Sequence, residues 1–148
     1  MKMELQTIAL HFVAALAASY SFALLFNSPK QQRFFGGLTG AIGWIIYRFA
    51  LHSGSSRLFS TFIAAVAVGI ISEISGRTRK APVTIFLLPG IIPLVPGADA
   101  YLAMLAFSSG DWASGLDITV KTLFLAGAIA GGTILTGSFS KFYRRTRT

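Results

Sequence analysis

The sequence has 148 residues, of which 53% are hydrophobic and 12% charged, whereas an ordinary soluble domain has roughly 25% charged residues. A water-soluble fold of this length could not bury so much apolar surface, and continuous apolar runs disfavour the alternating strands of a β-barrel. The net charge is +8, but the cations stand in short clusters between apolar runs, which indicates membrane topology and no nucleic-acid partner. The chain has no cysteine, which excludes disulfides and thiolate sites.

The apolar runs predict an all-α integral membrane protein, a bundle of about five transmembrane helices in a single domain over residues 1–148. A signal peptide is an alternative for the first run, but this run continues to Phe26 and is too long for a typical signal core. We therefore expect a retained span. The predicted spans cover, in chain order, residues 5–26, 34–51, 58–75, 83–107 and 118–139.

The positions of the cations agree with an odd number of spans. Five spans put a large group of cations on one side, which is cytoplasmic by the positive-inside rule, and a small group on the other side. This arrangement predicts a multi-pass protein of the cell inner (plasma) membrane, with the amino terminus outside and the carboxyl terminus in the cytoplasm. The large group is Lys30, Arg33, Arg77, Arg79, Lys80, Lys141, Arg144, Arg145 and Arg147; the small group is Lys2, Arg57 and Lys121.

The fourth predicted span contains three prolines and two glycines within residues 89–97. Each proline in a helix interior removes a backbone donor and costs roughly 3 kcal/mol, so we expect the helix to open near the middle of the bilayer. Unwound backbone at that depth must be buried in protein or line a watery cavity. A half-helix that starts near Gly97 would direct amide donors at a substrate carboxylate. A kinked helix satisfied by its neighbours and a re-entrant hairpin are the alternatives.

Charged residues inside spans are functional candidates because charge is costly in lipid. We expect Asp99 to carry a proton or cation or contact the substrate, to cap the half-helix that follows the break, or to do both. Arg48 either extends to the membrane interface or faces inward to pair with an anion. Two ion pairs at i,i+4 spacing are also expected, Glu73 with Arg77 and Asp117 with Lys121.

Small residues recur at the spacing of helix contacts, within the bundle or with a second chain. Tyr101 either lines the cavity at the break or packs, and Trp44 is expected to anchor at the membrane interface. The small-residue pairs are Gly36 with Gly40, Ala65 with Gly69, and Gly127 with Gly131.

The sequence contains no serine elbow, zinc-binding helix or phosphate loop. His11 and His52 are far apart and make no metal-binding motif. We therefore expect no enzymatic activity, no metal and no other cofactor.

Residues 89–97, which read PGIIPLVPG, and the following Tyr101 and Met104 resemble the signature of the threonine/serine exporter family. More narrowly, the chain resembles the small membrane subunit of the split, two-component form of that family. The Asn27-Ser28-Pro29 turn and the size and order of the spans extend the resemblance over nearly the whole chain. Family members often have glycine where this chain has Ala98-Asp99-Ala100, so Asp99 is a departure from the family pattern.

The resemblance implies a subunit of a secondary transporter, driven by the proton gradient, that exports small carboxylate-bearing metabolites. These are threonine and serine in fused members and dicarboxylates such as succinate in a split bacterial pair. The expected partners are a larger homologous membrane subunit, a carboxylate or amino-acid substrate and the lipid bilayer. A non-transporting scaffold or assembly subunit and a homo-oligomeric channel are the alternatives. The expected substrate-binding residues are Pro89, Gly90, Pro93, Pro96, Gly97, Asp99 and Tyr101.

Overall fold

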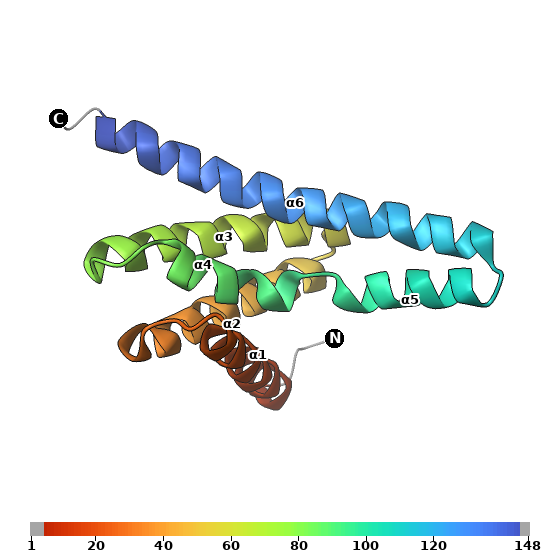
Figure 1. Ribbon diagram of the computed structural model, residues 1–148, viewed down its shortest axis with the longest axis horizontal. Helices are drawn as coiled ribbons and strands as arrows, with labels where there is room; N and C mark the ends of the chain where they lie inside the picture. The colour runs from red at the N-terminus through yellow and green to blue at the C-terminus, as the bar shows by residue number, and fades with distance from the viewer. Residues whose placement is uncertain (1–4, 146–148) are drawn as a thin grey trace.

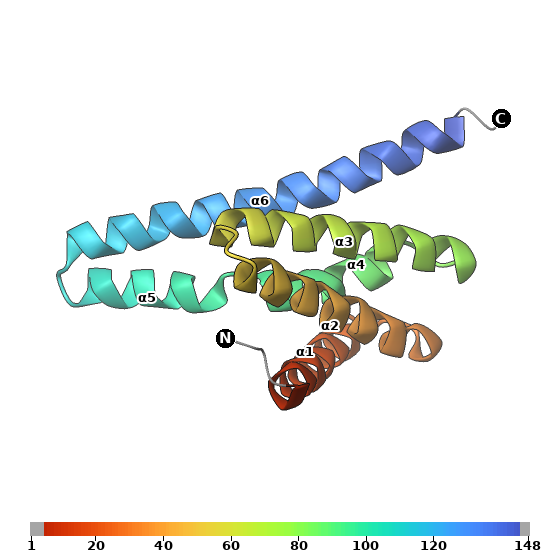
Figure 2. The same ribbon diagram turned by 180° about the vertical axis from the view of Figure 1, so that it is seen from behind.

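The computed structural model describes residues 5–145, with side chains from residue 6 to residue 138. Over these residues the predicted all-α fold is confirmed (Figures 1 and 2). Of the cations counted above, Lys2 and Arg147 lie outside the described residues. The elements are α1 (Leu5–Leu25), α2 (Lys30–His52), α3 (Arg57–Thr78), α4 (Thr84–Ile91), the 3-10 helix η1 (Ile92–Leu94), α5 (Gly97–Ser108) and α6 (Trp112–Arg145).

Four helices of the described chain, α1, α2, α3 and α6, are long and apolar enough to cross a membrane. The segment from α4 to α5 makes a fifth candidate span, which is bent by 51° at a short break. These five units correspond to the five predicted spans. The largest difference in boundaries is at α6, which begins at Trp112 rather than near residue 118 and is 34 residues long.

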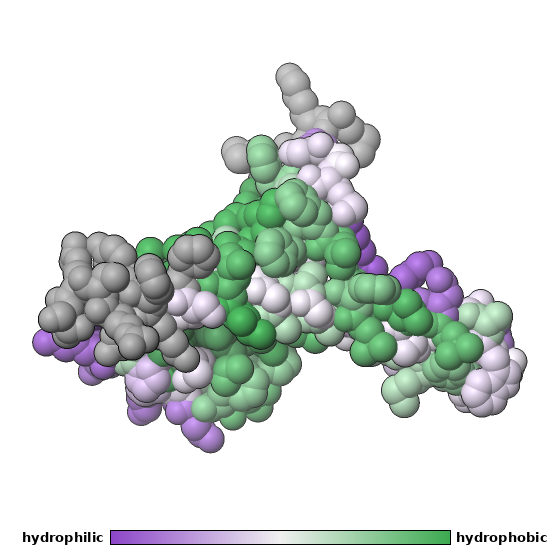
Figure 3. Space-filling view, turned by 90° about the horizontal axis from the view of Figure 1, so that it is seen from above, coloured by the Kyte–Doolittle hydropathy of each residue, from purple (hydrophilic) through white to green (hydrophobic). Residues whose placement is uncertain are grey.

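The first and third connections lie toward the same end of the molecule as the carboxyl-terminal end of α6, as an odd number of spans requires. The α1–α2 turn, the α3–α4 turn and the carboxyl-terminal end of α6 lie toward one end of the long axis, and the α2–α3 and α5–α6 turns lie toward the other (Figures 1 and 2). Hydrophobic side chains cover much of the middle of the molecular face in Figure 3, and hydrophilic ones lie mainly toward its two ends. This distribution is the one expected of helices that cross a bilayer.

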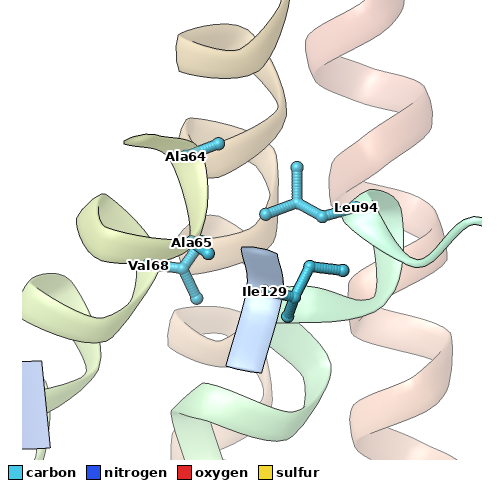
Figure 4. Packing of buried hydrophobic residues seen from close by; sticks show 5 residues of the cluster. All are labelled: Ala64, Ala65, Val68, Leu94 and Ile129. Atoms are coloured by element: carbon cyan, nitrogen blue, oxygen red, sulfur yellow. The ribbon is translucent and has the colours of Figure 1, made fainter. Parts of the chain in front are cut away.

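Small side chains on α3 allow the break and α6 to approach closely. A cluster of buried hydrophobic side chains joins the three segments (Figure 4). Trp44 and Tyr47 of α2 pack against this cluster. The five residues of the cluster are Ala64, Ala65 and Val68 of α3, Leu94 of η1 and Ile129 of α6.

Gly36 and Gly40 of α2 make the close contacts that their spacing predicts. A methyl group on Gly36 would lie 3.1 Å from Cγ of Pro89, and one on Gly40 would lie 2.8 Å from Cβ of Ser19. The glycine face of α2 therefore receives α4 on one side and α1 on the other, by the close approach that small residues permit in membrane bundles.

The contact between α3 and α6 is made by small residues on both helices. Gly69 lies against Thr136, as its spacing suggests, but a methyl group on Gly127 would meet no atom within 4 Å. The close approach is made by Gly132, where a methyl group would lie 2.9 Å from Cβ of Ala65. Packing within the bundle is therefore not found at Gly127, which leaves contact with a second chain as its predicted role.

Both predicted i,i+4 ion pairs are present. The nitrogen-to-oxygen distances are 3.9 Å for Arg77 and Glu73, and 2.6 Å for Lys121 and Asp117. All four side chains are at least partly exposed, so each pair contributes little to stability, about 0–1 kcal/mol.

Asp111 orders the turn between α5 and α6. Its Oδ1 accepts a hydrogen bond of 3.1 Å from the backbone N–H of Ser114, in the first turn of α6. Hydrogen bonds from the side chain and backbone of Ser114 lower the pKa of the Asp111 carboxyl, because they stabilise its charged form. The turn thus presents an ionised carboxylate at the positive end of the α6 dipole.

Candidate functional site

The helix break is shorter than the proline and glycine content predicts. Pro89 lies inside α4, and Pro93 lies near the start of η1, where a missing donor is tolerated. Only Val95 (ψ 127°) and Pro96 (ψ 54°) leave the helical conformation. The second half-helix, α5, starts at Gly97, as predicted.

Packing explains why Pro89 and Gly90 remain helical. Both are buried, and a methyl group on Gly90 would lie 2.9 Å from Cγ2 of Thr39 on α2 and from Cγ1 of Val68 on α3. The carbonyl of Pro89 also accepts a hydrogen bond from the N–H of Ile92. The expectation that all three prolines open the helix is wrong at Pro89, because two neighbouring helices hold that segment in place.

A cavity of about 170 Å³ lies beside the break. It is smaller than the roughly 300–1,000 Å³ pockets that hold drug-sized ligands, so it suits a small metabolite. Its lining comes from α2, α3, α6 and both sides of the break. The lining residues are Trp44, Tyr47, Arg57, Thr61, Pro93, Leu94, Val95, Pro96, Ala98, Asp99 and Leu125.

Arg57 and Asp99 form a bidentate ion pair at this cavity. Nη1 of Arg57 donates to Oδ1 of Asp99 at 3.2 Å, and Nη2 donates to Oδ2 at 2.5 Å. The pair joins the first residue of α3 to the first turn of α5. The Arg57 side chain is 54% exposed and that of Asp99 19% exposed. An ion pair with one such exposed partner contributes about 0–1 kcal/mol, so a competing charged ligand can separate it.

The structure bears on the capping role that is predicted for Asp99. No side-chain capping bond is present at the start of α5, and the carboxylate instead binds Arg57. Capping by a side-chain hydrogen bond is therefore wrong for Asp99. Its negative charge in the first turn of α5 still interacts favourably with the helix dipole.

The break lies beside the amino-terminal half of α3. Leu94, just before the break, belongs to a cluster with Ala64 and Val68 of α3, and Asp99, just after it, reaches Arg57, where α3 begins. The position of the break at the bilayer midplane stays a prediction.

The structure brings together part of the predicted substrate-binding set. Pro93, Pro96 and Asp99 line the cavity, whereas Pro89 and Gly90 belong to the packing of α4. Gly97 begins α5 between two lining residues, and no atom lies within 4 Å of the position of a Cβ on it. Tyr101 is 64% exposed and is not among the lining residues.

Sequence reasoning missed several residues of the cavity, and Arg57 is the most important of them. From the sequence alone, Arg57 is only a cation at the end of a span. A carboxylate in a span needs a partner, and Arg57 is one of the few cations on the same side of the predicted topology, so this signal was available. Tyr47, beside Arg57, and Thr61 offered no comparable signal.

Trp44, which is predicted to anchor at the membrane interface, lies at the cavity. It lines the cavity, its ring packs on Tyr47 with centroids 5.2 Å apart, and its Nε1 donates to Nδ1 of His11 at 3.5 Å. The aromatic side chain therefore forms one wall of the cavity and joins α1 to α2.

The other polar candidates lie away from the cavity lining. Arg48 is half-buried, and its Nε is buried with no hydrogen-bond partner among the described residues. Within residues 5–145, no group of three or more histidine, cysteine or acidic side chains could hold a metal ion.

Comparison with known proteins assigns the family. The family model described as Threonine/Serine exporter, ThrE, matches residues 11–139. A relative from Haemophilus influenzae, named only as an uncharacterized protein, is 29% identical over an alignment 139 positions long, which covers 88% of this chain and 46% of the relative. The chain thus spans about half the length of that curated relative, and no solved structure matches it. This multi-pass helical membrane protein, matched over most of its length, belongs to the threonine/serine exporter family.

Proposed function

We propose that this chain is one half of a secondary transporter that exports a small carboxylate-bearing metabolite, driven by the proton gradient. The substrate is an amino acid such as threonine or serine, or a dicarboxylate such as succinate. The observation that carries the proposal is the broken span beside a charged cavity in a member of this family. Such discontinuous helices build substrate sites in many secondary transporters.

A substrate carboxylate has two sources of positive potential at this cavity. Arg57 supplies a guanidinium fork, which matches carboxylate geometry. The amino-terminal end of α5 supplies backbone N–H groups and the positive end of the helix dipole. A substrate bound there displaces the carboxylate of Asp99 from its present position.

The second half is proposed to be a larger homologous membrane subunit. The chain spans 46% of its Haemophilus influenzae relative, so a comparable length of that relative lies outside the match. At the break, Val95 is 48% exposed and Gly97 faces open space. Irregular backbone at membrane depth does not face lipid, which supports a second protein that covers the break.

Flux through reconstituted vesicles tests this function. Vesicles that contain this chain and its larger partner are expected to move threonine, serine or succinate when a pH gradient is imposed, and vesicles with either chain alone are expected to stay inactive. Flux from this chain alone, without dependence on the gradient, would instead indicate a homo-oligomeric channel. Absence of flux from the pair with all three substrates would favour a scaffold.

The proposed orientation places the amino terminus outside and the carboxyl terminus in the cytoplasm of the plasma membrane. The α1–α2 and α3–α4 turns and the end of α6, which carry the larger group of cations, lie toward the same end of the molecule (Figures 1 and 2). Basic residues remain preferentially on the cytoplasmic side of a membrane.

Single cysteines test this orientation, because the natural chain has none. A cysteine at Ser109, in the exposed α5–α6 turn, is expected to react with a membrane-impermeant maleimide added to intact cells. A cysteine at Pro82, in the exposed α3–α4 connection, is expected to react only after the cells are opened. The reverse pattern of labelling would invert the proposed topology.

A further inference from the structure

We propose that Arg57 binds the carboxylate of the substrate and Asp99 its ammonium group. The pair then selects a zwitterionic α-amino acid over a dicarboxylate. The proposal rests on the proposed transport function and narrows it to one class of substrate. It assigns a specificity role to Arg57 and Asp99, the ion pair beside the helix break.

The ion pair already has the geometry of the contacts that an amino acid would make. The guanidinium of Arg57 holds two carboxylate oxygens at 3.2 and 2.5 Å. An amino-acid carboxylate can replace that of Asp99 on this fork, and the substrate ammonium group can then bind the freed carboxylate of Asp99. Each charge therefore remains paired after the exchange.

A dicarboxylate cannot make favourable contacts with both Arg57 and Asp99. One of its carboxylates could bind Arg57, but the other would lie near the negative charge of Asp99. Like charges brought together disfavour the wrong ligand, which is a common basis of specificity. The carboxylate of Asp99 therefore rejects succinate by the same charge with which it binds an ammonium group.

The remaining walls suit a small side chain with a hydroxyl group. Trp44 and Leu125 provide apolar surface beside the charged pair. The hydroxyl of Thr61 donates to the carbonyl of Arg57 at 2.9 Å, which leaves its oxygen able to accept a hydrogen bond from a substrate hydroxyl. The volume of about 170 Å³ limits the site to small solutes.

The same pair links substrate binding to the position of α5. This half-helix packs mainly on α6, and the bond from Asp99 to Arg57 ties it to α3. When a substrate takes the place of each partner, the direct tie between α5 and α3 is replaced by a contact through the substrate. Binding and release therefore change what holds α5 in place.

Efflux from cells of the source organism tests the proposal with the natural partner present. Cells that lack the chromosomal copy are complemented with the natural chain or with Asp99→Asn, loaded with labelled threonine, serine or succinate, and assayed for efflux. Asp99→Asn is expected to lower threonine and serine efflux at least about tenfold, because the ammonium group loses its counter-charge, and not to lower succinate efflux. Asp117→Asn is the matched control, since its carboxylate is exposed on α6 and does not line the cavity; it is expected to export as the natural chain does.

A second variant separates recognition from a structural role. Arg57→Gln combined with Asp99→Asn retains hydrogen bonding across the pair without charge, so the thermal unfolding of the purified chain is expected to be unchanged while amino-acid efflux is lost. Threonine and serine efflux at the natural rate from this double variant would overturn the proposal. If the natural chain exports succinate but neither threonine nor serine, the proposal is also overturned. The proposed transport function is then still supported. Efflux of none of the three would instead refute the transport function itself.

Discussion

Replacing Pro93 and Pro96 together by alanine is expected to reduce export to the level of cells that lack the chain. Each proline disfavours a continuous helix by roughly 3 kcal/mol, largely because it lacks a backbone donor. Alanine restores both donors, so α4 and α5 can join into one helix through the present break. The 51° bend is then lost, and Asp99 rotates away from Arg57.

Membrane insertion of the double variant is expected to remain normal, because a continuous helix crosses a bilayer at least as well as a broken one. Export is measured as metabolite efflux, and insertion as the amount of chain in the membrane fraction. Pro82→Ala is the matched control, since this proline lies in the exposed connection before α4; its efflux should equal that of the natural chain. Full export by the double variant would show that the break is not the substrate site.

Replacing Gly132 by valine is expected to destabilise the bundle strongly. The first carbon added at this position would lie 2.9 Å from Cβ of Ala65, 3.0 Å from the carbonyl oxygen of Phe62 and 3.1 Å from the amide nitrogen of Val66. Two of these atoms belong to the backbone of α3, so α6 must move away as a whole. Overpacking of this kind typically costs about 1–3 kcal/mol, occasionally more.

Gly127→Val is the matched control on the same helix. It carries the same change in helix propensity, but no atom of the described residues lies within 4 Å of the added carbon. Thermal unfolding of each purified chain in detergent measures the difference. The variant at Gly132 should unfold several degrees below the one at Gly127, and equal midpoints would show that α6 does not pack on α3 through Gly132.

Much of the helical framework could be predicted, because its determinants are local. Each span is an apolar run, and the restart of the helix at Gly97 follows from the missing donors of the preceding prolines. The continued helix through Pro89 could not be predicted in this way. It depends on contacts of Gly36 and Gly90 with neighbouring helices.

Only the part of the candidate site that lies on the broken span could be predicted from the sequence. The sequence marks Asp99 and the prolines because they are unusual within an apolar span. Arg57 lies 42 residues away along the chain and meets Asp99 only through the arrangement of α3 and α5. The close contact at Gly132 could not be predicted for a related reason, since the small residues of α6 do not reveal which face turns toward α3.

The length of α6 has a mechanical consequence. At a rise of about 1.5 Å per residue, its 34 residues form a rod of about 51 Å, well beyond the roughly 30 Å hydrocarbon thickness. Leu125 of this rod borders the cavity, and Gly132 rests on α3 at a point that can serve as a pivot. A change in tilt of about 10° would displace one end relative to the other by about 9 Å over this length. A small movement at the cavity is thus magnified at the opposite surface of the membrane.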